Sequence, residues 1–344
     1  MSRRSSQPTH RDKYPACRNE RLTSWLGVIL RGVAALALAA AALPAVAAAR
    51  SPAPAAVEAP SACPGHPNAL GTARVLFFDP ATLPPVGLQT YPRTLDLADH
   101  EVVLTFDDGP SRATTPLVLS ALEHDCVRAT FFLIGRNATE APDLVRREVA
   151  DGDLVAHHSW SHPAVTERGL PLATAKADIA RGFAADDLAA YGKAGEEPRV
   201  PLFRFPGFGD SPELLDWLRT RHVAVMGADL WASDWLDETP DAELALLMGR
   251  LRKAGRGIVL LHDIKPRTAA MLPALLAGLK QEGFRIVALA VGPGHASPVR
   301  SASAGWTSTT EAAVALAAAP RRARAAPHPA AAPAIDDPSR TTTR

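Results

Sequence analysis

The chain reads VVLTFDDGPS at residues 102–111, and this stretch decides how the rest of the sequence is interpreted. The run at 102–106 is mostly apolar, as in a buried strand, and two adjacent carboxylates, Asp107 and Asp108, follow it directly. Two like charges at the end of a strand are unfavourable unless a cation or a proton offsets them. The stretch therefore predicts a strand whose carboxyl end carries a charged site.

Short apolar runs alternate with amphipathic stretches on both sides of this segment. The runs that predict strands are 102–106, 129–135, 154–158, 202–205, 223–228, 257–262 and 284–289, and 73–80 is a further candidate. The stretches that predict helices are 114–125, 141–152, 171–191, 211–221, 239–255 and 267–283. Strands separated by helices indicate an α/β fold with a parallel sheet, either closed into a barrel or left open and doubly wound.

The two ends of the chain differ in composition from its centre. Basic residues precede an uncharged, Ala-rich run at 32–49 that contains an A-x-A pattern at 45–47, so residues 1–49 are expected to be a cleaved export signal, or else an N-terminal anchor. We expect the other parts to be a Pro/Ala linker (50–62), an extension packed on the domain (63–99), the domain (100–292) and a disordered Ala/Pro/Ser-rich tail (293–344).

Charge and cysteine content set further bounds. The 344 residues include 37 basic and 36 acidic side chains, a balance that argues against nucleic acid as a partner. Export would place Cys63 and Cys126 in an oxidising space, where they form either a disulfide or two unrelated thiols. A bridge over that loop would contribute roughly 4 kcal/mol in the chain-entropy model.

Polar residues follow several of the predicted strands, at the edge where parallel strands present their carboxyl ends. The residues at this edge are Asp107, Asp108, His158, His162, Arg204, Asp234, Trp235 and His262. One helical turn would bring His158 and His162 to one side, and with Asp108 they would make a three-ligand catalytic metal site. Asp107, facing the other side, would then accept a proton. DDGP would also suit a helix N-cap followed by a turn.

Five short motifs carry a family resemblance: TFDDGP, HSWSH, RFPG, SDW and LLH. Over about residues 100–290 their order and spacing resemble the polysaccharide deacetylases, the NodB-homology group also called carbohydrate esterase family 4. The resemblance implies a distorted (β/α)7-type barrel. It also implies metal-dependent N-deacetylation of an N-acetylated sugar polymer, with Zn²⁺ as the expected metal and Co²⁺ or a similar divalent ion as the alternative.

The resemblance also implies a role for each matching residue. Asp107 would be the general base, held by Arg204, and the metal ligands would be Asp108, His158 and His162. His262 would be the general acid, with Asp234 raising its pKa, and the Gly207 N–H would help to stabilise the oxyanion. The walls of the substrate pocket would be Phe208, Trp235 and Leu260.

This sequence departs from the common family pattern at two places. Gly207 stands where many relatives carry an aromatic residue, and Asp229 lies five residues before Asp234 rather than at the closer spacing often seen. The expected function is deacetylation of an N-acetylglucosamine-containing glycan, chitin-like or peptidoglycan-like, by an exported monomer of the periplasm, cell envelope or extracellular space. With the signal cleaved, no stable membrane insertion is expected. The alternatives are an O-acetyl esterase, hydrolysis of a small cyclic amide, which the export signal disfavours, and an inactive glycan-binding module.

Overall fold

The computed structural model describes residues 63, 65–163, 167–236 and 238–309. These residues all belong to the second of two units, Pro54–Arg344. The predicted signal, the linker at 50–62 and residues 310–344 of the predicted tail lie outside the described residues. In the part of the chain that is described, none of the helices has the length and apolarity to cross a bilayer.

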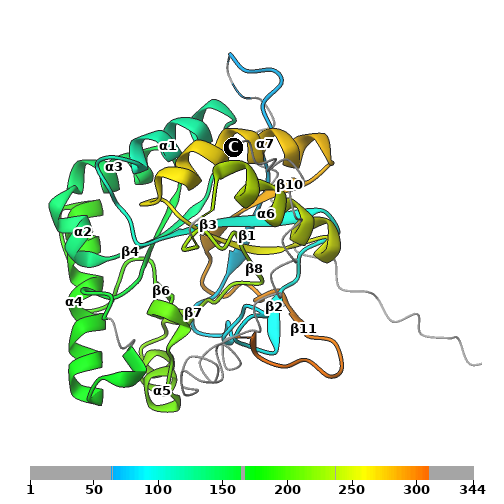
Figure 1. Ribbon diagram of the computed structural model, residues 1–344. Helices are drawn as coiled ribbons and strands as arrows, with labels where there is room; N and C mark the ends of the chain where they lie inside the picture. Colours follow the sequence, from blue (N-terminus) through cyan, green and yellow to red (C-terminus); the bar gives the residue numbers. More distant parts are fainter. Residues whose placement is uncertain (1–62, 64, 164–166, 237, 310–344) are drawn as a thin grey trace, which may run out of the picture. The chain divides into compact units, whose positions relative to one another are not determined.

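A nine-stranded sheet with parallel pairing forms the centre of the fold (Figure 1), which confirms the α/β expectation. Hydrogen-bonded neighbours run in the order β8-β9-β3-β4-β5-β6-β7, while β10 pairs with β1 and with the first residues of β3. The strands are β1 (Thr72–Phe78), β3 (Glu101–Asp107), β4 (Thr130–Leu133), β5 (Leu154–His157), β6 (Leu202–Phe203), β7 (Ala224–Val225), β8 (Leu230–Trp231), β9 (Gly257–His262) and β10 (Arg285–Val291).

Helices connect the strands, and three of them, α4, α5 and α6, begin or end at capping residues that the sequence supplies. The Ser211 and Thr239 side chains accept hydrogen bonds from backbone N–H groups in the first turn of their helices, and Gly192 and Gly255 end helices in the left-handed conformation. The helices are α1 (Thr115–His124), α2 (Gly135–Glu140), α3 (Pro142–Ala150), α4 (Leu172–Tyr191), α5 (Pro212–Thr220), α6 (Pro240–Ala254) and α7 (Pro266–Gln281). Only the short α2 was not expected from the sequence.

The sheet curves around a shared apolar interior, as in a distorted barrel. Along β3, Leu104 and Phe106 pack outward under the helices, whereas Val103 points inward, as strand alternation requires. The inner cluster takes residues from strands far apart in the pairing order, including Leu76, Phe132, Ala156, Ala224 and Ile258. Among the described residues, no backbone hydrogen-bonded pairing joins β7 to β8, so the ring of strands is open there. The carboxyl ends of the inner strands nevertheless share one edge.

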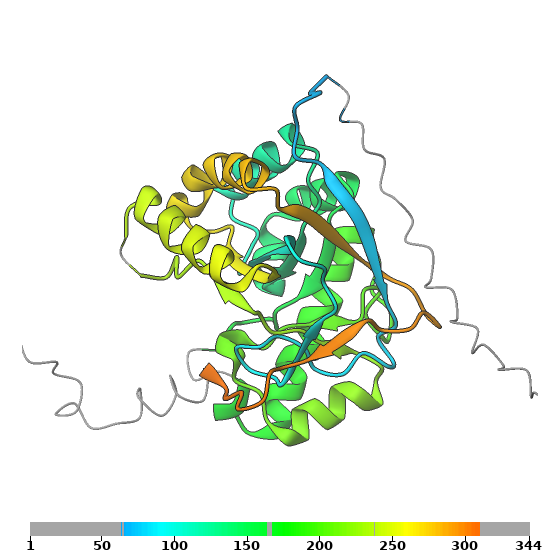
Figure 2. The same cartoon turned by 90° about the vertical axis from the view of Figure 1, so that its right-hand side faces the viewer.

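Part of the segment predicted to be a disordered tail is ordered. Residues of β11 (Val299–Ser301) pair antiparallel with β2 (Arg93–Leu95), and Figure 2 shows β11 beside this part of the chain. The Trp306 indole N–H also donates to Leu88 O at 2.8 Å. Assignment of residues 299–306 to disorder was therefore wrong, because backbone pairing and one aromatic anchor order a segment whose composition alone does not.

The extension at 63–99 is integrated into the domain. β1 pairs with β10 along its whole length, side by side in Figure 2. Cys63 and Cys126 form a disulfide with 5.6 Å between their Cα atoms, which resolves the two alternatives left by the sequence. The bond connects the start of the described chain to the loop after α1.

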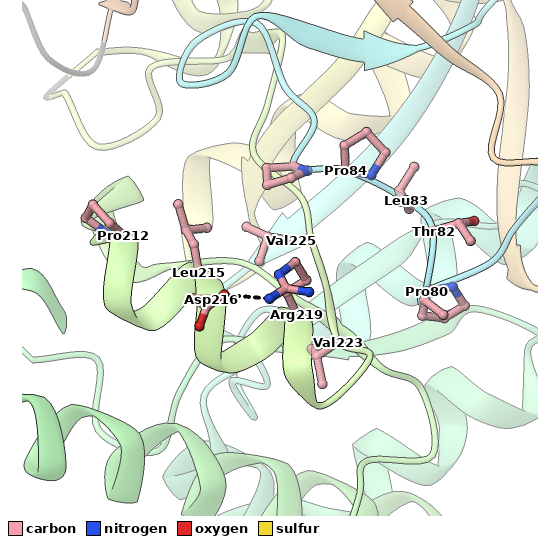
Figure 3. Close-up of a pocket in the computed structure, with 12 residues that line it drawn as sticks. Pro80, Thr82, Leu83, Pro84, Pro212, Leu215, Asp216, Arg219, Val223 and Val225 are labelled. Atoms are coloured by element: carbon pink, nitrogen blue, oxygen red, sulfur yellow. Dashed lines mark hydrogen bonds and ion pairs between the residues drawn. The ribbon is translucent and has the colours of Figure 1, made fainter. Parts of the chain in front are cut away.

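A cavity of about 510 Å³ lies away from the strand-end edge, between the 80–85 loop and α5 (Figure 3). Its lining includes Leu83, Pro84 and Leu215, and an Arg219–Asp216 ion pair lies along the helix. None of the predicted site residues lines this cavity. The predicted site residues therefore lie outside this cavity, at the carboxyl ends of the strands.

Candidate active site

Asp107 is buried and held by a single arginine. Arg204 Nη1 donates to Asp107 Oδ1 at 2.6 Å and to the Thr105 hydroxyl at 2.8 Å, and the guanidinium also donates to the carbonyls of Met226 and Gly227. Arg204 itself has no exposed surface. Burial raises the pKa of Asp107 above its ordinary value, and the Arg204 charge opposes that rise. The carboxylate is thus fixed in orientation by a rigid cation.

Asp108 turns toward the same side as Asp107. Its φ is +76°, so the alternation of the strand ends at this residue. Asp107 Oδ2 lies 3.7 Å and Asp108 Oδ1 lies 3.6 Å from His158 Nε2. The expectation that the two carboxylates face opposite sides is therefore wrong. Because the left-handed backbone at Asp108 reverses the side-chain direction, both acids point into one site.

His158 and His162 meet without a helix between them. The segment after β5 contains two residues with left-handed backbone, Ser159 (φ +64°) and His162 (φ +49°), and it forms bends rather than a helical turn. The two imidazole centroids are 5.1 Å apart, and His162 Nε2 lies 3.4 Å from Asp108 Oδ1. The predicted juxtaposition is confirmed, but the helical turn expected to create it is absent from this segment.

Asp108, His158 and His162 form a group that could hold a metal ion, with ligand atoms all within 4.8 Å of one another. His158 Nδ1 donates to Arg204 O at 2.8 Å, which leaves Nε2 as the lone-pair nitrogen directed at Asp108. Burial lowers the pKa of His158 to about 3, so the ring is neutral. Asp108 Oδ1 is buried and has no hydrogen-bond partner within the described residues.

The separations in this group fit coordination better than hydrogen bonding. The 3.4 and 3.6 Å distances from Asp108 Oδ1 to the two imidazoles exceed a normal N–H···O bond. Two ligands of one tetrahedral ion, each about 2.1 Å from it, lie about 3.4 Å apart. One carboxylate and two imidazoles also match the donor set of a catalytic zinc site. The residues present therefore fit a divalent metal.

His262 lies across from this group and is held by Asp234. Its Nδ1 donates to Asp234 Oδ1 at 2.7 Å, its backbone N–H donates to Asp234 Oδ2 at 2.7 Å, and its Nε2 lies 3.9 Å from Asp108 Oδ2. Burial by itself would lower the pKa of His262, but the hydrogen bond and charge of Asp234, together with the charges of Asp108 and Asp107, outweigh it and raise that pKa to about 9. His262 is therefore protonated at neutral pH with Nε2 toward the site.

Apolar and aromatic side chains flank His262. Trp235 is 48% exposed, with its ring centroid 6.2 Å from that of His262 and 5.5 Å from that of Trp231. Phe208 continues the row, 5.9 Å from Trp231. Leu260 is buried in β9, two residues before His262 and so on the same side of the strand. The predicted pocket residues thus come from three separate segments, and Phe208 is linked to His262 through the two tryptophans.

Gly207 belongs to a short 3-10 turn, Pro206–Phe208, directly after Phe205. Its φ is +56° with ψ +19°, a left-handed conformation that a glycine adopts without strain. The turn follows β6 and Arg204, so it leaves the sheet at the same edge as the other site residues. A residue with a side chain is disfavoured at this φ, so the glycine suits the turn as it is built here.

Two buried acids have roles that the sequence did not reveal. Asp229, for which no role was predicted, accepts hydrogen bonds from Leu88 N at 2.8 Å and from the Thr94 hydroxyl at 2.6 Å, so it joins the extension to the sheet. Asp263, the residue after His262, accepts a hydrogen bond from the Thr115 hydroxyl, which lies at the start of α1.

Asp263 also shapes the turn that follows the paired acids. A Cβ added to Gly109 would lie 2.3 Å from Asp263 Oδ2, so any larger residue at position 109 would collide with the Asp263 carboxyl group. Asn137 Nδ2 donates to Asp108 O at 2.7 Å from the other side. The sequence offered only positional signals for these roles: Asp263 follows His262 directly, and Asn137 comes soon after the predicted strand at 129–135.

These groups together define a hydrolytic α/β site: a buried carboxylate fixed by arginine, a possible metal group, and a protonated imidazole backed by a carboxylate. A family model for polysaccharide deacetylases matches residues 95–220. A peptidoglycan-N-acetylglucosamine deacetylase of Bacillus cereus is 34% identical over 199 residues, which cover 54% of this chain and 67% of that protein. A chitooligosaccharide deacetylase of Sinorhizobium fredii is 32% identical over 215 residues, covering 59% of this chain and 95% of that protein.

The chain belongs to the polysaccharide deacetylase family, as its five motifs predict. Its relatives place it among the hydrolases that act on non-peptide carbon–nitrogen bonds. The solved structure of a Bdellovibrio bacteriovorus peptidoglycan deacetylase superposes with a TM-score of 0.56 at 29% identity. That match covers 64% of this chain and 59% of the other.

Proposed function

We propose that this protein is an exported, metal-dependent N-deacetylase that hydrolyses the N-acetyl groups of an N-acetylglucosamine-containing glycan to free amine and acetate. The observation that carries the proposal is the placement of the Asp107–Arg204 pair, the Asp108–His158–His162 group and the Asp234–His262 pair around one site. Hydrolysis of an amide needs a base, charge stabilisation for the tetrahedral oxygen and an acid for the nitrogen.

Asp108, His158 and His162 would hold the metal, with Zn²⁺ expected and Co²⁺ or a similar ion as the alternative. A divalent cation bound there would act as a Lewis acid on the acetyl carbonyl and on water. The unpartnered Oδ1 of Asp108 and the free Nε2 of His158 support this assignment.

Asp107 would accept the proton of the attacking water. Its Oδ1 is bound to Arg204, so the remaining oxygen, Oδ2, faces the site and is available for the proton. The backbone N–H of Gly207 would contribute to stabilising the oxyanion, the role that the family resemblance implies for this residue. Proton transfer by a positioned carboxylate contributes about 10²–10⁴-fold to the rate.

His262 would deliver a proton to the leaving nitrogen. Its Nε2 points toward Asp108 while Nδ1 is committed to Asp234, so only Nε2 can reach a substrate. The pKa of about 9 keeps this ring protonated at neutral pH, which suits the departure of an amine. An ester releases an alcohol more easily and depends less on such an acid, and this difference favours N-deacetylation over O-deacetylation.

Phe208, Trp235 and Leu260 would form the wall of the acetyl-binding pocket. Trp235 lies beside His262, Leu260 lies two residues before it in β9, and Phe208 continues the aromatic row through Trp231. The partly exposed Trp235 ring offers a flat apolar surface to a sugar ring. The named relatives act on peptidoglycan N-acetylglucosamine and on chitooligosaccharides, so both polymer types are candidate substrates.

An envelope or extracellular location would bring the enzyme to such glycans. The basic leader and apolar run at 1–49 support export, and the Cys63–Cys126 disulfide is of the kind that persists in oxidising compartments. We propose that the exported protein acts as a monomer.

A product assay tests the function. The full chain with added Zn²⁺ would be incubated with chitooligosaccharides, peptidoglycan and acetylxylan, with and without chelator, while free amine and released acetate are measured separately. We expect equal amounts of amine and acetate from an N-acetylated glycan, abolished by chelation. Acetate without amine, from acetylxylan alone, would show an O-acetyl esterase instead.

A further inference from the structure

A second buried carboxyl group lies behind the Asp234–His262 pair. Glu243 is in the first part of α6 and is 1% exposed. Its Oε1 lies 3.3 Å from the hydroxyl oxygen of Thr268, which is itself fully buried and lies 2.9 Å from Asp234 Oδ2. A continuous series of polar contacts therefore runs from His262 through Asp234 and Thr268 to Glu243.

The number of available protons fixes the direction of these hydrogen bonds. Asp234 accepts hydrogen bonds from the backbone N–H and the ring Nδ1–H of His262. It is ionised, because these bonds and the His262 charge outweigh its burial and lower its pKa. The Thr268 hydroxyl has one hydrogen, and the ionised Asp234 is its stronger acceptor. Glu243 Oε1 therefore faces a lone pair of the hydroxyl oxygen. That contact is attractive only if Glu243 carries a proton and donates it.

The surroundings of Glu243 favour the protonated form. Burial, together with the Asp234 charge, raises the pKa of Glu243 to about 7, while the positive charges of Arg267 and His262 oppose the rise. Its Oε2 has no hydrogen-bond partner within the described residues, so no donor there stabilises a carboxylate. The side chain thus has both the geometry and the environment of a neutral carboxylic acid.

We propose that Glu243 is a positioning residue that donates a hydrogen bond to Thr268 and thereby holds the Thr268 hydroxyl on the carboxylate that orients His262. This inference rests on the proposed role of His262 as general acid. Ionisation of Glu243 removes the donor and places a second negative charge close to Asp234, so the support of the acid weakens as pH rises through 7.

Four single substitutions separate hydrogen bonding from shape, in the zinc-loaded full chain with a chitooligosaccharide substrate. Glu243→Gln keeps a donor of the same size, Glu243→Met removes it, and Thr268→Val removes the bridging hydroxyl. We expect E243Q to retain kcat within about twofold, and E243M and T268V to lose about fivefold in kcat with little change in KM, the effect of one lost hydrogen bond. Thr268→Ser restores the hydroxyl and should recover kcat.

The pH profile gives a readout that a purely structural role would not change. The parent should show a fall in kcat between about pH 6.5 and 8 that E243Q lacks, because the amide does not ionise in this range. Equal kcat losses in E243Q and E243M, or no loss in E243M, would overturn the proposal.

An infrared measurement keeps this test independent of the proposed activity. The difference spectrum of the parent minus E243Q at pH 6 should contain the C=O stretch of a protonated carboxyl group, and this band should disappear as pH rises past 7. Absence of the band at pH 6 overturns the inference even if the protein deacetylates glycans. Presence of the band in a protein that releases no amine refutes the proposed function and leaves the protonated Glu243 in place.

Discussion

Replacement of Asp107 by Asn is the most direct perturbation of the proposed chemistry. The substitution preserves shape but removes the charge and the proton-accepting oxygen. Asp107 Oδ1 accepts from Arg204 at 2.6 Å, and an amide oxygen can still accept that bond. Asp108, His158 and His162, which form the candidate metal group, keep all their atoms.

Two magnitudes follow from this geometry. Loss of the base should lower kcat by about 10²–10⁴-fold, equivalent to about 3–5 kcal/mol in the activation barrier. The buried Arg204 loses its ionic partner but retains the carbonyls of Met226 and Gly227. The free energy of unfolding should therefore fall by about 1–3 kcal/mol, the value of a hydrogen bond to a charged group, rather than by the larger cost of a fully orphaned charge.

The assay combines amine release from a chitooligosaccharide, metal content by mass spectrometry, and urea unfolding. D107N should contain as much zinc as the parent and show almost no turnover. The matched control is Asp108→Asn, which keeps the Asp107–Arg204 pair but should lose both zinc and turnover. Turnover of D107N within threefold of the parent, or loss of its zinc, would refute the reasoning.

Three further predictions concern the acid, the metal and the disulfide. Because Asp234 is the main group that raises the pKa of His262 to about 9, the large fall in kcat/KM of the parent should begin near that pH, above the smaller fall that Glu243 causes between about pH 6.5 and 8. In Asp234→Asn the large fall should begin near the ordinary histidine value of 6.5, and an unmoved alkaline limb contradicts the pairing. Chelation should abolish turnover and lower Tm, with both restored by Zn²⁺ or Co²⁺, and a chelated protein of unchanged Tm and activity would exclude the metal. Cys63→Ser should lower the free energy of unfolding by up to about 4 kcal/mol without changing kcat; stability equal to that of the parent would show that the bridge does not form.

Local sequence patterns predicted most of the secondary structure. The run at 257–262 coincides with β9, and the amphipathic stretch at 171–191 coincides with α4 (Leu172–Tyr191) to within one residue. Both signals are periodic over several residues and are reinforced by caps such as Gly192, so they survive without tertiary information. Short elements lack such periodicity: the two-residue β8 and the three-residue β2 and β11 exist because other strands pair with them.

The identities of the catalytic candidates also came from the sequence, but their geometry did not. Asp108, Ser159 and His162 all have positive φ, which local propensity disfavours for residues with side chains. Regular strand or helix geometry was the natural expectation at these positions. Strand geometry wrongly predicted that the Asp107 and Asp108 side chains point to opposite sides. Residues from other segments contact the backbone at these positions; for example, Asn137 Nδ2 donates a hydrogen bond to Asp108 O.

By itself the sequence determined which residue types stand at the ends of the strands, because that placement depends only on local pattern along the chain. The tertiary structure decided which oxygen and nitrogen atoms face each other, that Cys63 joins Cys126, and that Glu243 lies behind Asp234 through Thr268. Those relations join residues that are far apart in sequence. Only packing of the helices on the curved sheet brings them within bonding distance.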